Sequence, residues 1–407
     1  MKVLAAIVVP PHLSVSGAAR AAEELSAALA PHCNITVASM LDLDGRNLAA
    51  DGARSPARFP VRTSLPFSVP ESALPNRLRT PLYMSDIPDI VCNGNYDIVH
   101  LHNPMPAMEL ERIARACTAR GIPYVISTHG FNEIANGIEI YGFGPLQRLI
   151  WQHLIAGPIE RVVSNAASVF ALSPADIDIV RGMGFGGNDL PIVSNGVRMP
   201  SFAESPADRT ILERLGIPTA KQDGEFTCMF LANHTPNKGL PILLEAFARL
   251  DRPYLLLVGG DKRGNIEYDR YIRECRSGQQ IVVTGRLSDD EVTALFRRSD
   301  LFVFPTLADT FPLVVLEAMS HGVPVLASRV GGIPYQVTEQ CGALVSPGDA
   351  DELAAAIDRL AQEPETLKAM GRSARARVAA EFTWEHAAKQ ALAGYERVLH
   401  RNKSLAA

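Results

Sequence analysis

Residues 300–332 read DLFVFPTLADTFPLVVLEAMSHGVPVLASRVGG and combine strand and helix signals over a short length. Leu301–Phe304 and Val325–Ser328 are short apolar runs, and each predicts a buried strand. Pro312–His321 lies between them and predicts a helix. Pro312 suits the first helical turn, because the N–H that proline lacks would have no partner there. Strand, helix and strand with short connections predict a parallel sheet covered by helices.

The same alternation continues on both sides of this stretch. Short apolar runs are separated by segments with a helical pattern, which again indicates parallel strands with helices on both faces. The other predicted strands are Val3–Val9, Asn34–Ala38, Asp97–Leu101, Tyr124–Thr128, Val169–Ala171, Ile192–Val193, Phe226–Leu231, Tyr254–Val258 and Ile281–Thr284. The other predicted helices are Gly17–Ala30, Glu109–Arg120, Leu146–Ala167, Pro241–Arg249, Tyr268–Cys275 and Asp289–Arg297.

The alternation is interrupted over residues 198–225, which hold three prolines and many polar residues. This stretch predicts a connector with one short helix between two domains. We expect an N-terminal Rossmann-like domain at residues 1–197 and a C-terminal one at residues 198–385. Residues 386–407 predict a last helix that packs back on the N-terminal domain. The fold class is therefore α/β, with two doubly wound domains that face a central cleft, where such sheets bind ligands.

Composition excludes several classes of protein. The chain has 407 residues, 47% of them hydrophobic, which suits two packed domains. A net charge of −5 argues against a nucleic-acid partner. Six scattered cysteines without a Cys-x-x-Cys pair predict free thiols rather than a zinc site. The N-terminal apolar run ends early at two prolines, so we interpret it as a strand, and we expect a cytoplasmic protein, with peripheral contact with the inner membrane left open.

The opening stretch also contains an anion site in outline. The N–H groups of Leu313 and Val314 begin the predicted helix, and the helix dipole there favours a phosphate. Asp309 precedes the helix and Glu317 lies inside it. Taken singly, Asp309 fits a helix cap better than a ligand contact. Glu317 lies in a mostly apolar helix, where a carboxylate needs a partner.

The spacing of Asp309 and Glu317 resembles the Glu-x7-Glu element of the retaining family-4 glycosyltransferases, which are two-domain GT-B enzymes. EAMSHGVPVLASRVGG resembles the segment of that family around the second acid. The resemblance implies that Asp309 holds hydroxyls of a donor sugar and Glu317 holds the ribose. Residues 229–250, MFLANHTPNKGLPILLEAFARL, resemble the segment whose Arg and Lys bind the donor diphosphate. Lys238 matches the Lys, whereas Asn233 stands where Arg is usual.

The resemblance implies a catalytic set and a wider donor-binding set. The catalytic set is His129, Lys238, Asp309 and Glu317. The donor-binding set is Gly17, Asn233, Lys238, Gly260, Arg286, Asp309, Phe311, Pro312, Leu313, Val314 and Glu317. Because Asn233 brings no charge, we expect another cation to compensate for the missing Arg. The candidates in order are Arg286, Lys262 and Arg263.

The first half of the chain offers three weaker elements. Gly17 opens a helix after the first strand and resembles a family loop that usually has two glycines. His129 in STHG resembles the active-site His of the family, and a structural His is the alternative. His100 and His102 share a strand face, but two ligands alone are weak support for a metal. The resemblance instead puts His102 beside the cleft.

Two further patterns invite metal or lipid interpretations. Asp42-x-Asp44 and Asp349-x-Asp351 match an Asp-x-Asp metal pattern, but we expect a turn and a helix cap respectively. We therefore predict no metal and no cofactor. Leu146–Val163 carries an apolar stripe with Trp151 that suits either a lipid or a core, and its low basic content favours core packing.

These observations predict a retaining, hexosyltransferase-type enzyme of class EC 2.4. It would move a sugar from a nucleotide-diphosphate donor to a hydroxyl of a carbohydrate, lipid-linked or small-molecule acceptor. The pathway would make a polysaccharide, a lipopolysaccharide, or a glycolipid or natural product. Acceptor contacts are expected in the loops Ser64–Asp86 and Phe131–Phe143. Two alternatives stay open: a nucleotide-sugar epimerase of the same fold, which would convert the free donor, and a non-catalytic nucleotide-sugar-binding protein.

Overall fold

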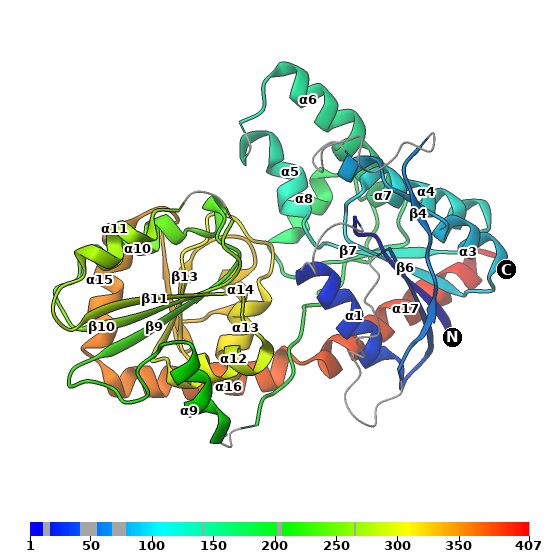
Figure 1. Ribbon diagram of the computed structural model, residues 1–407. Helices are drawn as coiled ribbons and strands as arrows, with labels where there is room; N and C mark the ends of the chain where they lie inside the picture. The colour runs from blue at the N-terminus through cyan, green and yellow to red at the C-terminus, as the bar shows by residue number, and fades with distance from the viewer. Residues whose placement is uncertain are drawn as a thin grey trace. The chain divides into compact units, whose positions relative to one another are not determined.

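The computed structural model describes residues 1–10, 17–40, 55–66, 79–140, 142–201, 206–263 and 266–406. It contains two six-stranded sheets and one two-stranded sheet, with helices packed on both faces of the large sheets (Figure 1). The chain divides into two compact units. Unit 1 is Met1–Gly196 with Trp384–Ala407, and unit 2 is Val197–Thr383. The predicted α/β class with two doubly wound sheets is confirmed.

Unit 1 is built on a parallel sheet in the order β3-β2-β1-β6-β7-β8. The chain starts in the middle at β1, moves to one edge, and returns to fill the other side. The carboxyl ends of β1 and β6 therefore meet where the order reverses, with Ile7 in register with His102. The strands are β1 (Lys2–Ile7), β2 (Asn34–Ser39), β3 (Ala57–Phe59), β6 (Ile98–His102), β7 (Tyr124–Ser127) and β8 (Ser168–Phe170).

Helices cover both faces of this sheet (Figure 1). On one face, α1 (Gly17–Leu29) packs against α17 (Trp384–Ala406), the last helix of the chain. On the other face, α4 packs against α3 and α7. The remaining elements of unit 1 are α3 (Ile87–Asn93), α4 (Ala107–Ala119), α5 (Phe131–Ile140), α6 (Pro145–Trp151), η4 (Gln152–Ala156), α7 (Gly157–Ser164), α8 (Asp176–Gly182), β4 (Thr63–Ser64), β5 (Met84–Ser85) and η3 (Thr80–Leu82).

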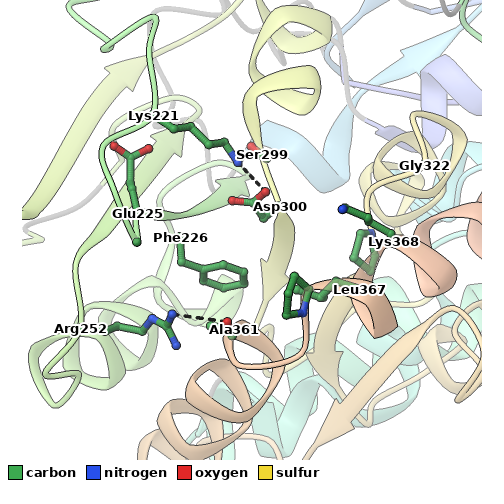
Figure 2. Close-up of a pocket in the computed structure, with 13 residues that line it drawn as sticks. Lys221, Glu225, Phe226, Arg252, Ser299, Asp300, Gly322, Ala361, Leu367 and Lys368 are labelled. Atoms are coloured by element: carbon green, nitrogen blue, oxygen red, sulfur yellow. Dashed lines mark hydrogen bonds and ion pairs between the residues drawn. The ribbon is translucent and has the colours of Figure 1, made fainter.

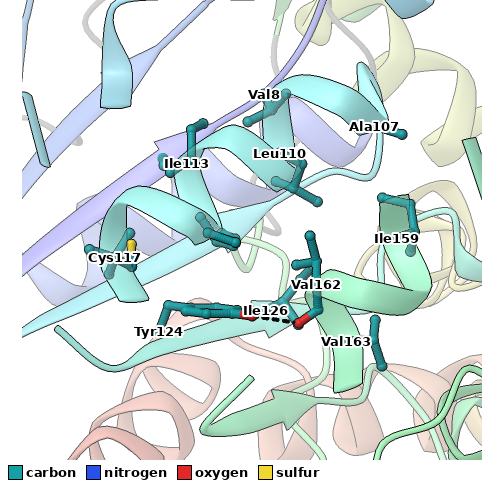
Figure 3. Close-up of a cluster of buried hydrophobic side chains, with 14 of the residues drawn as sticks. Val8, Ala107, Leu110, Ile113, Cys117, Tyr124, Ile126, Ile159, Val162 and Val163 are labelled. Carbon is teal, nitrogen blue, oxygen red and sulfur yellow. Dashed lines mark hydrogen bonds between the residues drawn. The ribbon is translucent and has the colours of Figure 1, made fainter. Parts of the chain in front are cut away.

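The core of unit 1 lies between the sheet and the α4–α7 layer. Figure 3 shows Leu110 of α4 pointing toward Ile159 and Val162 of α7, and each of these side chains has no more than 1% of its surface exposed. The Tyr124 hydroxyl, at the start of β7, donates to the backbone oxygen of Val162 at 2.7 Å. This bond satisfies a buried polar group and ties the helix layer to the sheet.

The segment predicted as one helix over Leu146–Ala167 is broken, and its packing differs from the prediction. A π-helical turn, η4, separates α6 from α7, and Pro158 has no N–H to continue regular α-helical bonding. The α7 part is core, as predicted. Core packing is wrong for α6, because Leu146, Leu149 and Ile150 are 70%, 57% and 48% exposed.

Unit 2 repeats the same plan in the order β11-β10-β9-β12-β13-β14, again all parallel. The reversal of strand order lies between β9 and β12. The strands are β9 (Phe226–Leu231), β10 (Tyr254–Gly259), β11 (Gln279–Gly285), β12 (Leu301–Phe304), β13 (Val325–Ser328) and β14 (Gly342–Val345). The helices are α9 (Pro206–Arg214), η5 (Pro236–Lys238), α10 (Leu240–Ala248), α11 (Tyr268–Glu274), α12 (Asp289–Arg298), α13 (Leu313–Ser320), α14 (Ile333–Gln336), α15 (Ala350–Ala361) and α16 (Pro364–Glu381).

One predicted strand did not form. Residues Ile192 and Val193 belong to no strand, and Ile192 makes only an isolated bridge to Ala171. The chain leaves unit 1 soon afterwards, between Gly196 and Val197. Pairing is limited to Ala171, which donates to Pro191 O at 3.0 Å and accepts from Val193 N at 2.8 Å.

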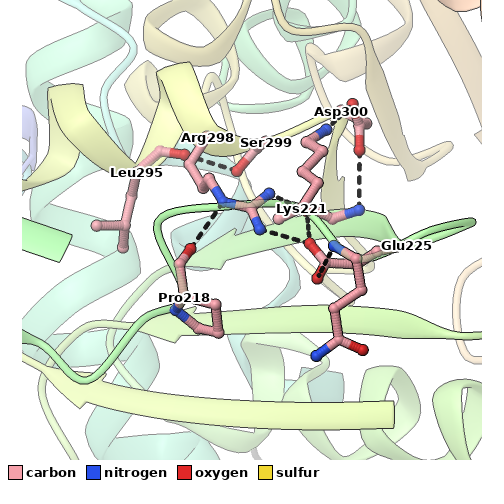
Figure 4. Close-up of polar contacts among 9 residues, drawn as sticks. Pro218, Lys221, Glu225, Leu295, Arg298, Ser299 and Asp300 are labelled. Carbon is pink, nitrogen blue, oxygen red and sulfur yellow. Dashed lines mark hydrogen bonds and ion pairs between the residues drawn. The ribbon is translucent and has the colours of Figure 1, made fainter. Parts of the chain in front are cut away.

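A buried ion pair holds the amino edge of the unit 2 sheet together (Figure 4). Arg298, at the end of α12, pairs with Glu225 just before β9, and both side chains are 5% exposed. The same guanidinium donates to the Thr227 hydroxyl at 2.6 Å and to the Pro218 backbone oxygen at 3.1 Å. Burial raises the pKa of Glu225, but the hydrogen bonds from Arg298, Gln222 N and Thr227, together with the charge of Arg298, leave that pKa below its ordinary value. The connector, a strand and a helix are thus joined by one side chain.

We predict that Arg298→Met lowers the free energy of unfolding by about 3 kcal/mol at pH 7, because it leaves a buried carboxylate unpaired. The pKa of Glu225 is lowered in the folded protein. The stabilisation is therefore present above its ordinary pKa and is lost as the pH falls through the folded value. The difference from the parent protein, measured by urea unfolding, should shrink at acidic pH. Arg298→Met with Glu225→Gln should recover part of the loss, and equal instability of both variants would contradict this account.

Candidate active site

Two loops of unit 2 bring a lysine and an aspartate together where the strand order reverses. Residues 232–239 follow β9, and residues 305–312 follow its neighbour β12. The Lys238 Nζ atom lies 2.7 Å from Oδ2 of Asp309. The two side chains are 23% and 17% exposed, so both remain accessible to a ligand. The pair therefore occupies the position at which doubly wound sheets bind ligands.

The two loops are joined backbone to backbone. The Asn237 backbone oxygen accepts bonds from Leu307 N at 2.7 Å and from the buried Thr306 hydroxyl at 3.0 Å. Gly239 adopts a φ of +74°, and a Cβ there would lie 1.8 Å from the backbone oxygen of Pro305. Only glycine permits both this conformation and this approach.

A third loop fixes Asp309 from the other side. Gly331 follows β13 with a φ of +51°, and a Cβ there would lie 1.9 Å from the backbone oxygen of Asp309. Gly332 N donates to Thr310 O at 2.8 Å, and Gln336 Nε2 donates to Pro312 O at 3.1 Å. The position of the Asp309 carboxylate is thus set by main-chain contacts on both sides.

Helix α13 starts directly after this loop. Pro312 is its N-cap and makes no side-chain capping bond. The capping role, which was the alternative for Asp309 taken singly, is therefore excluded, and its carboxylate pairs with Lys238 instead. Leu313 and Val314 are half-buried in the first turn, where backbone N–H groups have no helical acceptor. Glu317 is also half-buried, and it lies one turn further along the helix.

The loop after β10 packs against the Lys238 loop. Gly260 has a φ of +122°, and a Cβ there would lie 1.7 Å from the Ala232 backbone oxygen. His234 is buried between the Tyr268 hydroxyl and the Gly259 backbone oxygen, which lies 3.2 Å from its Nε2. Burial lowers the pKa of His234. Its neutral ring is therefore a brace that fixes the path of the chain on either side.

The cations proposed to replace the missing Arg are exposed. Asn233 and Arg286 are exposed on separate loops. Lys262 lies with its ammonium 5.7 Å from the centre of the Tyr268 ring, and Arg263 pairs with Asp261 at 3.4 Å. The structure therefore holds Lys238 in a built position but leaves these three cations on the surface. Their predicted roles stay predictions.

In unit 1, two buried histidines lie at the carboxyl edge of the sheet. The His129 ring follows β7, is 5% exposed, and has a centroid 6.4 Å from that of His102. Burial lowers the pKa of His129 to about 4 and that of His102 well below its ordinary value. Thr128 donates to Asp176 at 2.6 Å, which fixes the backbone beside His129. Both rings are neutral near pH 7.

Metal binding gains no support from the described residues. His100 uses both ring nitrogens, with the Tyr395 hydroxyl at 2.6 Å and the Ser127 hydroxyl at 2.8 Å. Asp349 caps α15 as expected, accepting from Glu352 N at 2.8 Å. Within the part of the chain that the structure describes, no three His, Cys, Asp or Glu residues form a group that would hold a metal ion. Asp42, Asp44 and the loop before Gly17 lie outside the described residues, whereas Gly17 begins α1.

A hollow elsewhere on unit 2 lies at the opposite edge of the sheet (Figure 2). Phe226, Asp300 and Pro324 line it, and each lies at or just before the start of a strand. Arg252 lies across it and donates to the Ala361 backbone oxygen at 3.4 Å. Because ligands of doubly wound sheets bind at the carboxyl ends of the strands, this hollow is not the expected site.

Comparison with known proteins agrees with this geometry. The family model of glycosyltransferase family 4 matches residues 15–199, and the model of glycosyl transferases group 1 matches residues 216–377. Together they cover most of both units. The chain belongs to the family-4 glycosyltransferases, which have the GT-B fold.

Individual relatives of this glycosyltransferase are also transferases. An MMP α-(1→4)-mannosyltransferase of Mycolicibacterium hassiacum is 28% identical over 326 residues, which are 76% of this chain and 72% of the relative. A D-inositol 3-phosphate glycosyltransferase of Mycobacterium tuberculosis is 30% identical over 323 residues, which are 75% of this chain but only 62% of the relative. These relatives do not favour the epimerase or the non-catalytic alternative.

Solved structures share the fold of the glycosyltransferase. A sucrose-phosphate synthase from Thermosynechococcus elongatus has a TM-score of 0.70 at 21% identity, covering 98% of this chain and 99% of that one. The Anabaena protein HepE in complex with UDP-glucose has a TM-score of 0.70 at 19% identity, covering 99% of this chain and 100% of that one.

Across the described residues, no helix has the length and apolar character needed to cross a bilayer.

The structure brings together only part of the predicted residue set. Lys238 and Asp309 are in contact, and Phe311 and Pro312 lead from them to the start of α13. Gly17 and His129 belong to unit 1. Sequence reasoning missed the glycine contacts, although Gly331 lies in the quoted stretch and Gly239 follows the lysine directly. The adjacent glycines at 331 and 332 were the available signal.

We predict that Gly239→Ala destabilises the glycosyltransferase by about 3 kcal/mol, since its Cβ would meet the Pro305 backbone oxygen. Gly216→Ala is the matched control, because Gly216 has a similar φ of +70° and nothing within 4 Å of its Cβ position. That control pays only the conformational cost of about 1 kcal/mol. Urea unfolding of both variants measures the difference. Equal losses would show that the close approach of the loops is unimportant.

Proposed function

We propose that this glycosyltransferase moves a hexose from a nucleotide-diphosphate donor to a hydroxyl acceptor, with retention at the anomeric carbon. The observation that carries the proposal is the Lys238–Asp309 pair, whose atoms lie 2.7 Å apart next to the first turn of α13. A cation and a helix N-terminus suit a diphosphate, and a carboxylate suits sugar hydroxyls. The pair would therefore bind the donor at the junction between its diphosphate and its sugar.

The diphosphate would be held by two kinds of positive group. Lys238 supplies a full charge, and the N–H groups of Leu313 and Val314 supply oriented dipoles. Because the ammonium already contacts Asp309, binding requires Lys238 to divide its hydrogen bonds between the carboxylate and the phosphate. Asn233 adds a neutral donor where related enzymes place an Arg. Arg286, Lys262 and Arg263 remain our candidates, in that order, for the missing charge.

The remaining donor contacts follow from the same helix. Glu317, half-buried one turn into α13, would accept bonds from the ribose hydroxyls. Asp309 would accept bonds from the hexose hydroxyls, and its side chain is about one methylene shorter than the usual Glu. His129 is neutral near pH 7, because burial lowers its pKa to about 4, so it would donate a hydrogen bond as an uncharged ring.

The chemical step needs no nucleophile from the protein. The acceptor oxygen forms a bond to the anomeric carbon while the bond from that carbon to the phosphate oxygen breaks, and its electrons pass to the phosphate. The acceptor proton moves to the departing phosphate oxygen on the same face. Lys238 and the start of α13 would stabilise the charge that develops on the leaving group. Attack and departure on one face preserve the configuration.

The comparisons support a nucleotide-sugar donor. HepE, which shares the fold, is described in complex with UDP-glucose, and two relatives are named a mannosyltransferase and a D-inositol 3-phosphate glycosyltransferase. We extend the nucleotide-sugar donor and a polar hydroxyl acceptor to this chain. A metal-independent reaction is part of the proposal. The exposed apolar residues of α6 keep open the alternative of peripheral membrane contact.

A donor screen tests the site. We expect the parent protein to bind one or more of UDP-, GDP-, ADP- and dTDP-sugars, and Glu317→Ala to weaken the best one about ten- to a hundredfold through lost ribose bonds. Lys238→Met should lower kcat about a hundredfold, since it removes charge from the leaving group. Glu245→Ala, on an exposed face of α10, is the control. Unchanged donor binding by the Glu317 variant would refute the assignment, and binding without turnover would support the non-catalytic alternative.

The stereochemistry and metal requirement are tested together. We predict that the product keeps the anomeric configuration of the donor, as followed by proton NMR during the first turnovers. Activity should be unchanged in EDTA, because the charged groups that we assign to the diphosphate belong to the protein. Inversion at the anomeric carbon, or loss of activity that Mg²⁺ or Mn²⁺ restores, would contradict the mechanism.

A further inference from the structure

Asn103 is held in an unusual conformation directly after β6. Its φ is +67°, and it is the one non-glycine residue of the described ranges with a positive φ. The left-handed region is costly for a residue with a Cβ, and glycine would relieve the cost. Such conformations persist where the surrounding structure imposes them, and they cluster at ligand sites. The position is the reversal of strand order in unit 1, between β1 and β6.

The side chain of Asn103 is buried without a partner. The residue is 5% exposed, and neither its amide oxygen nor its amide nitrogen has a hydrogen bond. Asparagine in this conformation commonly bonds to nearby backbone, which would repay the backbone cost. Here the amide makes no such bond, so folding alone does not account for the residue. The amide is therefore a buried group whose hydrogen bonds a ligand entering at this edge would complete.

Neighbouring groups at the same edge share this character. The His102 Nδ1 atom is also buried without a partner. The backbone of His102 is fixed by Val8 N, which donates to His102 O at 3.1 Å. Pro104 packs against Gly130, where a Cβ would lie 3.2 Å from the Pro104 Cγ atom. The Asn103 loop is thus held between the ends of β1 and β7, beside the neutral rings of His102 and His129.

We infer that Asn103 determines acceptor specificity by binding two neighbouring hydroxyls, as carbohydrates and cyclitols present them. The inference rests on the proposed function, and it names the class of acceptor that unit 1 binds. One acceptor hydroxyl donates to Oδ1 of Asn103, and the amide nitrogen donates to the next hydroxyl oxygen. Hydroxyls serve both ends because each is donor and acceptor.

Other ligand chemistries fit the amide less well. A phosphate dianion offers only acceptor oxygens, so it would satisfy the nitrogen and face the amide oxygen without a donor. A lipid alcohol carries one hydroxyl and would leave one end of the amide unsatisfied. Charge agrees with this choice, because the rings of His102 and His129 are neutral and bring no cation for an anion.

The test uses the full chain and two variants. Asn103→Gly removes the amide and relieves the backbone, whereas Asn103→Asp keeps one acceptor oxygen and loses the N–H donors. The diol probes are myo-inositol, methyl α-glucoside and methyl α-mannoside, with cyclohexanol and inorganic phosphate as comparators. Binding of the diols and of cyclohexanol is followed by saturation-transfer NMR of their own protons, phosphate is added as a competitor of the diol signal, and transfer is followed with the best donor. Asn165→Ala, at an exposed asparagine of unit 1, is the control.

We expect the parent to bind at least one diol probe, to leave cyclohexanol unbound, and to keep the diol signal when phosphate is added. Both Asn103 variants should raise the KM or Kd for that probe at least tenfold, with donor affinity unchanged. Asn103→Gly should unfold at the same temperature as the parent or higher, since glycine adopts this φ without strain. A structural role would instead lower its unfolding temperature.

Several outcomes would overturn the inference. They are unchanged acceptor KM or Kd in both variants, tighter parent binding of cyclohexanol than of any diol, displacement of the diol by phosphate, and destabilisation of the glycine variant. Failure of the proposed function is distinct, because the parent would then neither bind nor turn over a nucleotide sugar. In that case the NMR arm still decides whether the amide binds diols.

Discussion

The approach of three loop backbones at the end of the unit 2 sheet is the constraint on which the site depends. Gly239 lies against the Pro305 backbone oxygen, and Gly331 lies against that of Asp309. Side chains at these glycines would separate loops that come from different strands. Because the backbones are in contact, Lys238 of one loop and Asp309 of another form an ion pair without a rearrangement of either loop. The contact between the two charged side chains therefore depends on the packing of uncharged backbone against backbone.

The sequence was sufficient for most of the fold, because buried parallel strands are continuous apolar runs bounded by turns. Every predicted strand of unit 2 formed with small changes at its ends. The failures have local causes. Pro158 interrupts regular helical bonding in the segment predicted as one helix, and Ile192 makes an isolated bridge only. The exposure of α6 was not visible from an apolar stripe alone, because the stripe does not say which part meets the core.

The part of the site whose residues lie close together in the sequence was predictable. Asp309, Glu317 and Lys238 lie in sequence segments that resemble those of a known family. In the structure, Lys238 and Asp309 are in contact. The capping role for Asp309 was wrong because a proline occupies the N-cap. The brace at His234 and the orphaned amide of Asn103 could not be predicted, since both depend on contacts between segments far apart in the chain or on one backbone angle. Such features require coordinates, and spacing alone does not reveal them.

Unit 2 is an insertion in the chain of unit 1, because the last helix returns to the first sheet. Val197 N donates to Phe382 O at 2.9 Å, so the two chain crossings lie side by side. During synthesis, unit 2 is therefore complete before unit 1 can be. His100 and Phe170 can make their contacts with Tyr395 only after all of unit 2 has been synthesised. A chain truncated before α17 keeps the whole of unit 2 but leaves part of one face of the first sheet uncovered, as a substrate for chaperones or proteases.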